Sequence, residues 1–105
     1  MFKIKYLPAA KQDLKDITRY ISVELGAPKA AERLVNKIDD KVEKLLQFPR
    51  MYKKYIPVKE LSDTYRVILV NNFLVFYVIL EKHIEIRRVI YAKRDIDAIL
   101  EETDE

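Results

Sequence analysis

Apolar and polar side chains follow two different periods along the chain. Residues 2–6 carry apolar side chains on one face and basic side chains on the other, which predicts a short strand with one solvated side. Two longer segments then place an apolar residue at every third or fourth position, like the buried stripe of an amphipathic helix. Pro8 and Pro28 suit the first turns of these segments, so we expect helices over residues 8–25 and 28–47.

A short turn joins the two predicted helices. Gly26, the only glycine in the chain, follows the first apolar stripe, where a helix commonly ends in a left-handed residue. We expect the second helix to end before Phe48-Pro49, because proline disfavours helical geometry in the residue that precedes it. Two helices joined by so short a turn form an antiparallel helical hairpin.

The C-terminal half changes to the period of a β-sheet. Residues 50–63 show no clear period and contain Pro57, so we expect a loop there. The pattern predicts a closing helix and three strands with a two-residue turn at Asn71-Asn72: strands Thr64–Val70, Phe73–Leu80 and Ile84–Tyr91, then helix Asp95–Leu100. Tight turns make the sheet antiparallel, and the helical hairpin can cover one of its faces. The prediction is a single two-layer α+β domain over residues 1–105, in the order β-α-α-β-β-β-(α).

The composition excludes several classes of chemistry. The 105 residues include one Gly, one His and no Cys. Without cysteine there is no disulfide, thiol nucleophile or Cys-based zinc site, and a single glycine cannot build a phosphate-binding loop that needs several. We therefore expect no metal and no cofactor, and any chemistry must use Lys, Arg, Tyr, Asp or Glu.

Nothing in the sequence predicts export or a membrane span. Residues 1–5 lack a basic segment followed by an apolar stretch. The longest apolar run, Phe73–Leu80, is much shorter than the roughly 20 residues needed to cross a bilayer. We expect a cytoplasmic protein with no membrane partner.

The net charge of +3 conceals an uneven distribution. Residues 44–59 hold five basic residues and no acid, with Tyr52 and Tyr55 among them, whereas residues 95–105 hold six acids and no base. Basic groups interleaved with aromatic rings suit single-stranded nucleic acid, because rings stack on bases and cations follow phosphates. A loop that carries solvated lysines is an equally good explanation, so the charge pattern leaves both open.

Arginines interrupt the predicted strands. Arg66 lies within an otherwise apolar strand, and its role stays open. Arg88 shares the alternation of Ile86, which is expected to face the core. An arginine on such a face needs a carboxylate or carbonyl partner. We therefore expect Arg88 to form a partly buried ion pair, with Glu60 or Asp63 as candidate acids.

Short motifs occur in order at residues 10–14, 20–21, 28–31, 46–49, 65–66, 75–78, 84–91 and 93–95. Together they resemble the RelE/ParE superfamily of bacterial type II toxins. The resemblance implies the same β-α-α-β-β-β core in a growth-inhibiting toxin of a plasmid-stabilising addiction module. It also implies a cognate antitoxin that folds over the toxin on binding, with operator DNA reached only through that antitoxin.

The family holds two activities on this fold. RelE-like members cleave mRNA in the ribosomal A site with Lys and Arg side chains, and the matching positions are Lys53, Lys54 and Arg94. Such enzymes carry an arginine where this chain has Leu74, and a catalytic Tyr or His that residues 96–105 lack. An apolar leucine cannot hold a scissile phosphate. These departures favour the ParE-like branch, whose members poison DNA gyrase without covalent chemistry.

We therefore interpret the chain as a ParE-like toxin that binds gyrase. The alternatives are a ribosome-dependent mRNA endonuclease of the RelE type and a non-toxic nucleic-acid-binding or interaction domain. Gly26 and Arg88 are expected to be structural. The residues expected to bind the target or nucleic acid are Lys53, Lys54, Tyr55, Arg66, Arg87, Tyr91, Lys93 and Arg94.

Overall fold

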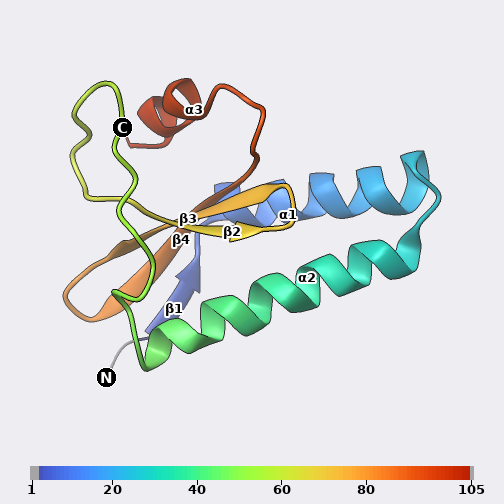
Figure 1. Ribbon diagram of the computed structural model, residues 1–105, viewed down its shortest axis with the longest axis horizontal. Helices are drawn as coiled ribbons and strands as arrows, with labels where there is room; N and C mark the ends of the chain where they lie inside the picture. The colour runs from blue at the N-terminus through green and yellow to red at the C-terminus, as the bar shows by residue number, and fades with distance from the viewer. Residues whose placement is uncertain (1–2, 105) are drawn as a thin grey trace.

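The computed structural model describes residues 3–104, which form helical layers on both faces of a four-stranded sheet (Figure 1). The elements in chain order are β1 (Lys3–Tyr6), α1 (Pro8–Arg19), η1 (Tyr20–Glu24), α2 (Pro28–Glu43), η2 (Lys44–Leu46), β2 (Arg66–Val70), β3 (Phe73–Ile79), β4 (His83–Tyr91) and α3 (Ile96–Thr103). The predicted α+β class and order of elements are confirmed. Phe2 of the predicted first strand lies outside the described residues, as does Glu105 of the acidic C-terminal segment.

The two long helices begin where the prolines predict. Pro8 stands in the first turn of α1 and Pro28 in the first turn of α2. Neither helix has a side-chain cap, because Leu7 and Ala27 offer no side-chain oxygen to the unpaired N–H groups. Proline reduces this deficit, since it has no N–H of its own. The start of each helix therefore depends on a proline rather than on a polar cap.

The turn between the helices depends on Gly26. The last turn of the first helix, η1, widens to a π-helix in which the Leu25 N–H donates to the Tyr20 carbonyl over 3.0 Å. Gly26 then takes a φ of +63°, as its position in the sequence predicts. This geometry lets the Ala27 N–H donate to the Ile21 carbonyl over 2.9 Å and directs the chain into α2.

The helical hairpin covers one face of the sheet, and its tip extends beyond the turn between β2 and β3 (Figure 1). The apolar stripe of α2 is buried against the sheet, whereas in α1 Ala10 is fully buried and Leu14 and Ile17 are half-buried against the same core. Tyr77 is fully buried here, and its hydroxyl donates to the Pro49 carbonyl over 2.8 Å. The buried residues of this first core are Ala10, Leu34, Ile38, Val42, Leu45, Ile68, Val70, Val75, Tyr77, Ile84, Ile86 and Val89.

The sheet has the order β1-β4-β3-β2. β2 pairs with β3, and β3 with β4, in antiparallel fashion, and Asn71 takes a φ of +54° in the predicted two-residue turn. β1 pairs with β4 in parallel, so the sheet is mixed rather than wholly antiparallel. The helical hairpin separates β1 from the other strands in sequence, and no tight turn therefore dictates its direction.

A second apolar core lies on the opposite face of the sheet, beneath α3 and the loop that precedes β2. α3 extends further than the predicted helix, and Asp95 caps it by accepting from the Ala98 N–H over 3.2 Å. The two-layer prediction is therefore incomplete, because α3 forms a third layer. The buried residues of this second core are Tyr65, Val67, Phe76, Val78, Ile90, Ile99 and Leu100.

A β-bulge at Arg87 changes which side chains of β4 face each core. Tyr77 pairs with Ile86 and Phe76 with Arg88, so Arg87 has no opposite residue on β3. The alternation of side chains reverses at this point. The uninterrupted strand pattern predicted that Arg88 shares the face of Ile86. The bulge places it on the opposite face.

Replacing Gly26 by alanine should lower the free energy of unfolding by about 1–2 kcal/mol, because a Cβ disfavours positive φ. Apart from its chain neighbours, no described atom lies within 4 Å of the added Cβ, so the loss comes from the backbone alone. Gly26→Asn is the matched control and should lose less, since asparagine tolerates this geometry. Chemical denaturation measures the difference, and an alanine variant as stable as the parent protein would contradict the assigned turn.

Candidate functional site

Asp13 of α1 binds the open edge of β4. β1 covers this edge only as far as Ile86. Beyond it, the Asp13 carboxylate accepts hydrogen bonds from Nε and Nη2 of Arg88 and from the Val89 N–H, each over 2.8 Å. The hydrogen bond to Asp13 raises the pKa of Arg88, which keeps the guanidinium charged. One carboxylate therefore closes the strand edge that β1 leaves open.

Arg88 also links this edge to the C-terminal helix. Its Nη1 donates to the hydroxyl of Thr103 in α3 over 3.3 Å. The sequence predicted an ion pair for Arg88 with Glu60 or Asp63 as the acid, but the partner in the structure is Asp13. The reason is the fold itself, since α1 crosses beside the edge of β4 and brings Asp13 to it.

Arg87 points into a cluster of acids rather than toward solvent. Its guanidinium forms ion pairs with Asp63 and Glu85, each over 3.0 Å, and lies 3.9 Å from Asp104. It also donates to the Tyr65 hydroxyl over 3.0 Å. Burial acts to lower the pKa of Arg87, but the bond to Tyr65 and the pairing with Asp63 raise it overall. Only 11% of the side chain is exposed, so the guanidinium is held within the protein, and the expected contact of Arg87 with a target stays a prediction.

Two aspartates of the acidic C-terminal segment hold the loop before β2. The Asp97 carboxylate accepts from the Tyr55 hydroxyl and from the Val58 N–H, the latter over 2.7 Å. Asp104 accepts from the Ser62 N–H over 2.5 Å. The bond from Tyr55 lowers the pKa of Asp97, while burial and the same bond raise the pKa of Tyr55 to about 12. Tyr55, predicted to contact the target, therefore points inward.

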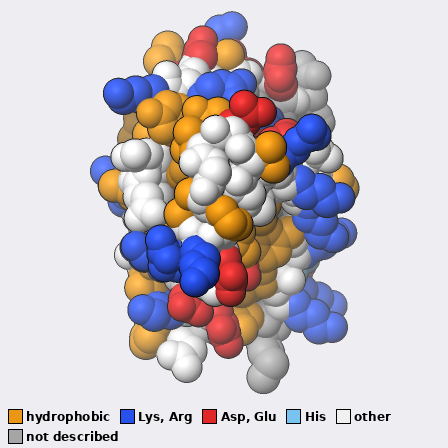
Figure 2. Space-filling view, turned by 90° about the vertical axis from the view of Figure 1, so that its right-hand side faces the viewer, with side chains coloured by type: hydrophobic (Ala, Val, Ile, Leu, Met, Phe, Trp, Pro, Cys, Tyr) orange, Lys and Arg blue, Asp and Glu red, His pale blue; other side chains and the backbone are white. Residues whose placement is uncertain are grey.

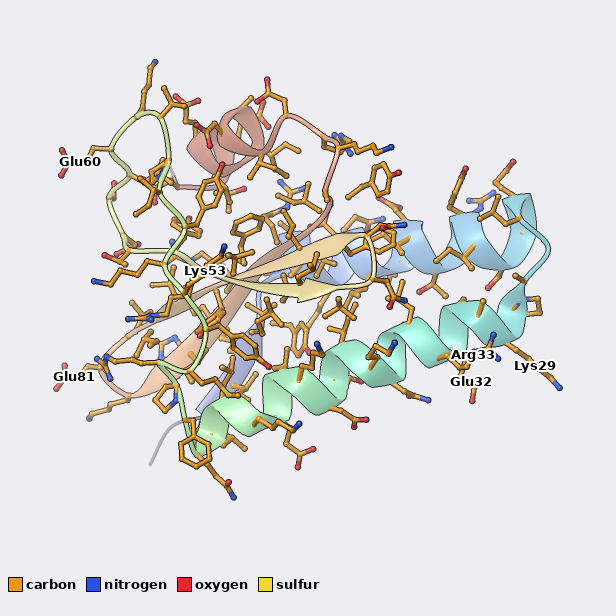
Figure 3. All side chains as sticks on the ribbon, viewed as in Figure 1. Lys29, Glu32, Arg33, Lys53, Glu60 and Glu81 are labelled. Atoms are coloured by element: carbon orange, nitrogen blue, oxygen red, sulfur yellow. The ribbon has the colours of Figure 1, made fainter. Side chains whose placement is uncertain are left out.

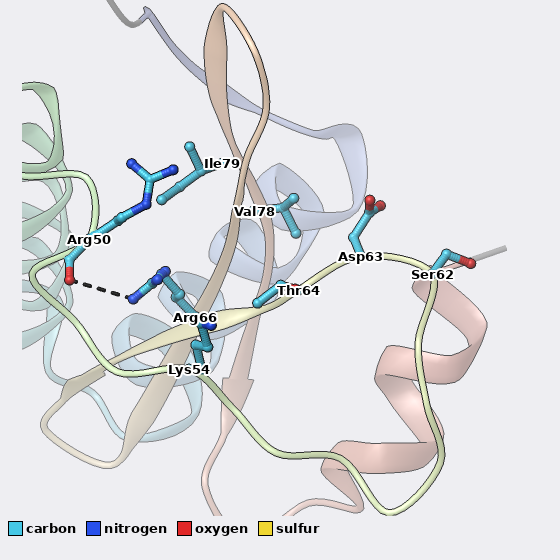
Figure 4. Close-up of a pocket in the computed structure, with 8 residues that line it drawn as sticks. All are labelled: Arg50, Lys54, Ser62, Asp63, Thr64, Arg66, Val78 and Ile79. Carbon is cyan, nitrogen blue, oxygen red and sulfur yellow. Dashed lines mark hydrogen bonds between the residues drawn. The ribbon is translucent and has the colours of Figure 1, made fainter.

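A basic pocket lies at the end of the sheet where β2 begins (Figure 4). Three cations, Arg50, Lys54 and Arg66, line this space of about 400 Å³. Nη1 of Arg66 donates to the Tyr52 carbonyl over 2.8 Å and to the Arg50 carbonyl over 3.5 Å, so Arg66 also holds the loop in place. The residues that complete the lining are Ser62, Asp63, Thr64, Val78 and Ile79.

An apolar groove of about 700 Å³ lies at the other end of the sheet, between the hairpin tip and the β2–β3 turn. Tyr91 lines it and packs against Phe73, with ring centroids 5.7 Å apart. Lys93 and Arg94 follow Tyr91 in an exposed turn. Figure 2 shows hydrophobic side chains across this end of the molecule, between groups of Lys and Arg side chains. The helical side of the groove is formed by Asp16, Ile17, Tyr20, Ile21, Leu25, Ala27, Ala30 and Leu34.

The predicted binding residues divide between these two ends. Lys54 pairs with Arg66, which lies in the same row of the sheet as Tyr77, whereas Tyr91 pairs with Phe73, four residues away along β3. At about 3.4 Å per residue, the rows are roughly 14 Å apart. Lys54 lines the basic pocket, Lys53 precedes it on the exposed loop, and Arg94 lies in the exposed turn after β4. The three residues matched to a ribonuclease are therefore not brought together.

Several interacting residues carried no sequence signal. Asp13 lies on the polar side of its helix, 75 positions before Arg88, and only the packing of α1 brings the two together. The sequence marks Asp97 only as part of an acidic segment, and its partners Tyr55 and Val58 precede it by about 40 positions. In the sequence Arg50 is one of five basic residues with no further signal, although it shares a pocket with Arg66. Within residues 3–104, no helix is long and apolar enough to span a membrane.

Comparisons with known proteins identify the class. The family described as the ParE toxin of the type II toxin–antitoxin system parDE matches residues 4–96, so the chain belongs to the ParE toxin family. It is a ParE-like toxin, whose partner in such a system is a cognate antitoxin. A solved structure from the chromosomal ParDE system of P. aeruginosa has a TM-score of 0.70 and 23% identity, covers 89% of this chain and 98% of its own, and shows the shared fold. No curated protein matches the chain.

Asp13→Ala should lower the free energy of unfolding by about 2–3 kcal/mol, because it leaves the Arg88 guanidinium and the Val89 N–H without their shared acceptor. Asp16→Ala is the matched control on the same helix. Among the described residues, Asp16 accepts a hydrogen bond only from Gln12, on the exposed surface, so its loss should change stability by no more than about 0.5 kcal/mol. Equal losses in the two variants, measured by denaturation, would disprove the role of Asp13.

The contacts of α3 should weaken in acid. Hydrogen bonds from Tyr55 and Val58 lower the pKa of Asp97; burial acts to raise the pKa of Asp104, but bonds from Ser62 lower it overall. Each carboxylate thus stabilises the fold at pH values above its ordinary pKa, which is near 4. This contribution is lost as the pH falls through the lower pKa of the folded state. Asp97→Asn should flatten the decline in unfolding free energy below pH 4, whereas Asp40→Asn on exposed α2 should not. Identical pH profiles for Asp97→Asn and the parent would contradict this.

Proposed function

We propose that this ParE-like toxin inhibits growth in the cytoplasm by binding DNA gyrase, without covalent chemistry, until its cognate antitoxin covers it. The family supports this proposal, because ParE-like members are expected to poison gyrase. Operator DNA would then be contacted only through the antitoxin. The strongest structural support is the apolar packing on the sheet face that carries Leu74.

The face of the sheet opposite the hairpin is filled with apolar side chains. Leu74 packs against the second core, which contains the fully buried Phe76, and Ile96 of α3 packs against the same core. Phosphodiester cleavage needs space for ribose and phosphate and cations aimed at the developing charge. An apolar side chain beneath a docked helix supplies neither, which favours action by binding.

The positions of the cations support the same proposal. A ribonuclease must direct its charged groups to one phosphate, because misplacement by even 1 Å reduces the rate. Lys54 lines the basic pocket with Lys53 next to it in the chain, whereas Arg94 lies in the turn after β4 at the opposite end of the sheet. Arg87 is held by acids of the protein itself.

The basic pocket favours a second candidate function, which is cleavage or binding of RNA. Arg50, Lys54 and Arg66 line one concave site, and three cations around such a space suit a phosphate. Asp63 is part of the same lining and would oppose a bound anion. We therefore rank this candidate below gyrase binding.

Purified toxin should inhibit gyrase supercoiling and leave ribosome-bound mRNA uncut, as read by primer extension. Lys53→Ala plus Lys54→Ala should weaken supercoiling inhibition roughly three- to tenfold, because exposed charges mainly affect the rate of association. Lys29→Ala plus Arg33→Ala, which removes the same charge at the start of α2 (Figure 3), is the matched control and should have no effect.

Codon-dependent mRNA cleavage that disappears in Lys53→Ala plus Lys54→Ala would replace this proposal with the ribonuclease. Growth inhibition that survives this double substitution in full, with no mRNA cleavage, would exclude the ribonuclease. Normal growth on strong induction without antitoxin would favour the third alternative, a non-toxic interaction domain.

A further inference from the structure

The loop of residues 53–60 exposes two aliphatic side chains among lysines. Ile56 is 81% exposed and Val58 is 92% exposed, more than any other large hydrophobic residue in the described part of the chain. Lys53, Lys54 and Lys59 are exposed around them. Figure 3 shows Glu60 pointing away from the body of the protein at the outer turn of the same loop. Loop 53–60 therefore combines an apolar tip with a mainly basic surround.

This loop is held by hydrogen bonds along most of its length. The Tyr55 N–H donates to the Tyr65 carbonyl over 2.8 Å, and the Tyr55 hydroxyl donates to Asp97. The Val58 N–H donates to Asp97 over 2.7 Å, and Lys59 lies 3.5 Å from Glu101. Ile56 and Val58 are thus displayed from a backbone fixed at both sides. Binding through such a preorganised loop costs less ordering entropy than binding through a mobile one.

The tyrosines of this region do not face solvent in a way that suits nucleic acid. Tyr52 packs against the first core, and the Tyr55 ring packs edge-on against Phe76 with centroids 5.3 Å apart. Single-stranded nucleic acid is bound by aromatic rings that stack on bases. The side chains that loop 53–60 exposes in their place are aliphatic. These fit an apolar pocket on another protein, and the surrounding lysines fit an acidic rim.

We propose that loop 53–60 is the surface that docks on the target protein, with Ile56 and Val58 in an apolar pocket and Lys53, Lys54 and Lys59 against acidic side chains. The partner chemistry is a protein with an acidic surface around that pocket. This inference rests on the proposed function, in which the target protein is DNA gyrase. α3, which fixes the loop, extends beyond the residues matched to the toxin family.

The test replaces Ile56 and Val58 by serine together and compares the variant with the parent chain. The control replaces Val23 and Leu69 by serine. These two side chains are 66% and 59% exposed and lie elsewhere on the molecule. Both variants should unfold at the same temperature as the parent, since none of these side chains is buried. Three readouts follow: growth inhibition on induction, inhibition of gyrase supercoiling, and binding to a 20-nucleotide single-stranded RNA probe.

The loop variant should lose at least about tenfold in growth inhibition and in gyrase inhibition, the cost of removing two buried aliphatic contacts, while the control stays unchanged. Full activity of the loop variant in both assays overturns the inference and leaves gyrase binding intact. Loss of growth inhibition in the loop variant, with a parent chain that does not inhibit gyrase, keeps the loop and rejects gyrase as the target. A different result overturns the inference in favour of RNA. In that case Lys53→Ala plus Lys54→Ala abolishes RNA binding, whereas the loop variant keeps both RNA binding and growth inhibition. A parent chain without any growth inhibition also overturns it.

Discussion

The contact between the Asp13 carboxylate and the edge of β4 joins the three layers of the protein. The carboxylate binds both Arg88 and the Val89 N–H, and Arg88 in turn contacts Thr103 of α3. Removing a carboxylate and a guanidinium from water costs free energy, which short charge-assisted hydrogen bonds offset. The same contact holds the helical hairpin against one face of the sheet and the end of α3 against the other.

The second face of the sheet shows how the uneven charge is used. The acidic C-terminal segment binds the basic loop within the same molecule, through Asp97 to Tyr55 and Val58 and through Asp104 to Ser62. These hydrogen bonds hold α3 and the loop over this face of the sheet, where their apolar side chains pack in the second core. The two ends of the sheet and the tip of loop 53–60 stay exposed to partners.

Much of the fold could be predicted, because it depends on local pattern. The prolines, Gly26 and the Asn71 turn each act on the backbone within a few residues, and each occurs where expected. The candidate site was harder to predict. Lys54 and Tyr91 are exposed at least in part, as a binding role requires. Arg87 is turned inward by Asp63 and Tyr55 by Asp97, and both acids are distant in sequence.

Sequence by itself determined the class of elements, their order and the toxin family, since periodicity and short motifs are properties of neighbouring residues. Tertiary structure alone decided the parallel pairing of β1, the bulge that reverses β4 at Arg87, and the pairing of Arg87 with Asp63 and of Arg88 with Asp13. These features depend on contacts between segments that are tens of residues apart in the sequence. It also decided that the aliphatic side chains of the basic loop face solvent while its tyrosines do not, because α3 holds the hydroxyl of Tyr55 from the inner side.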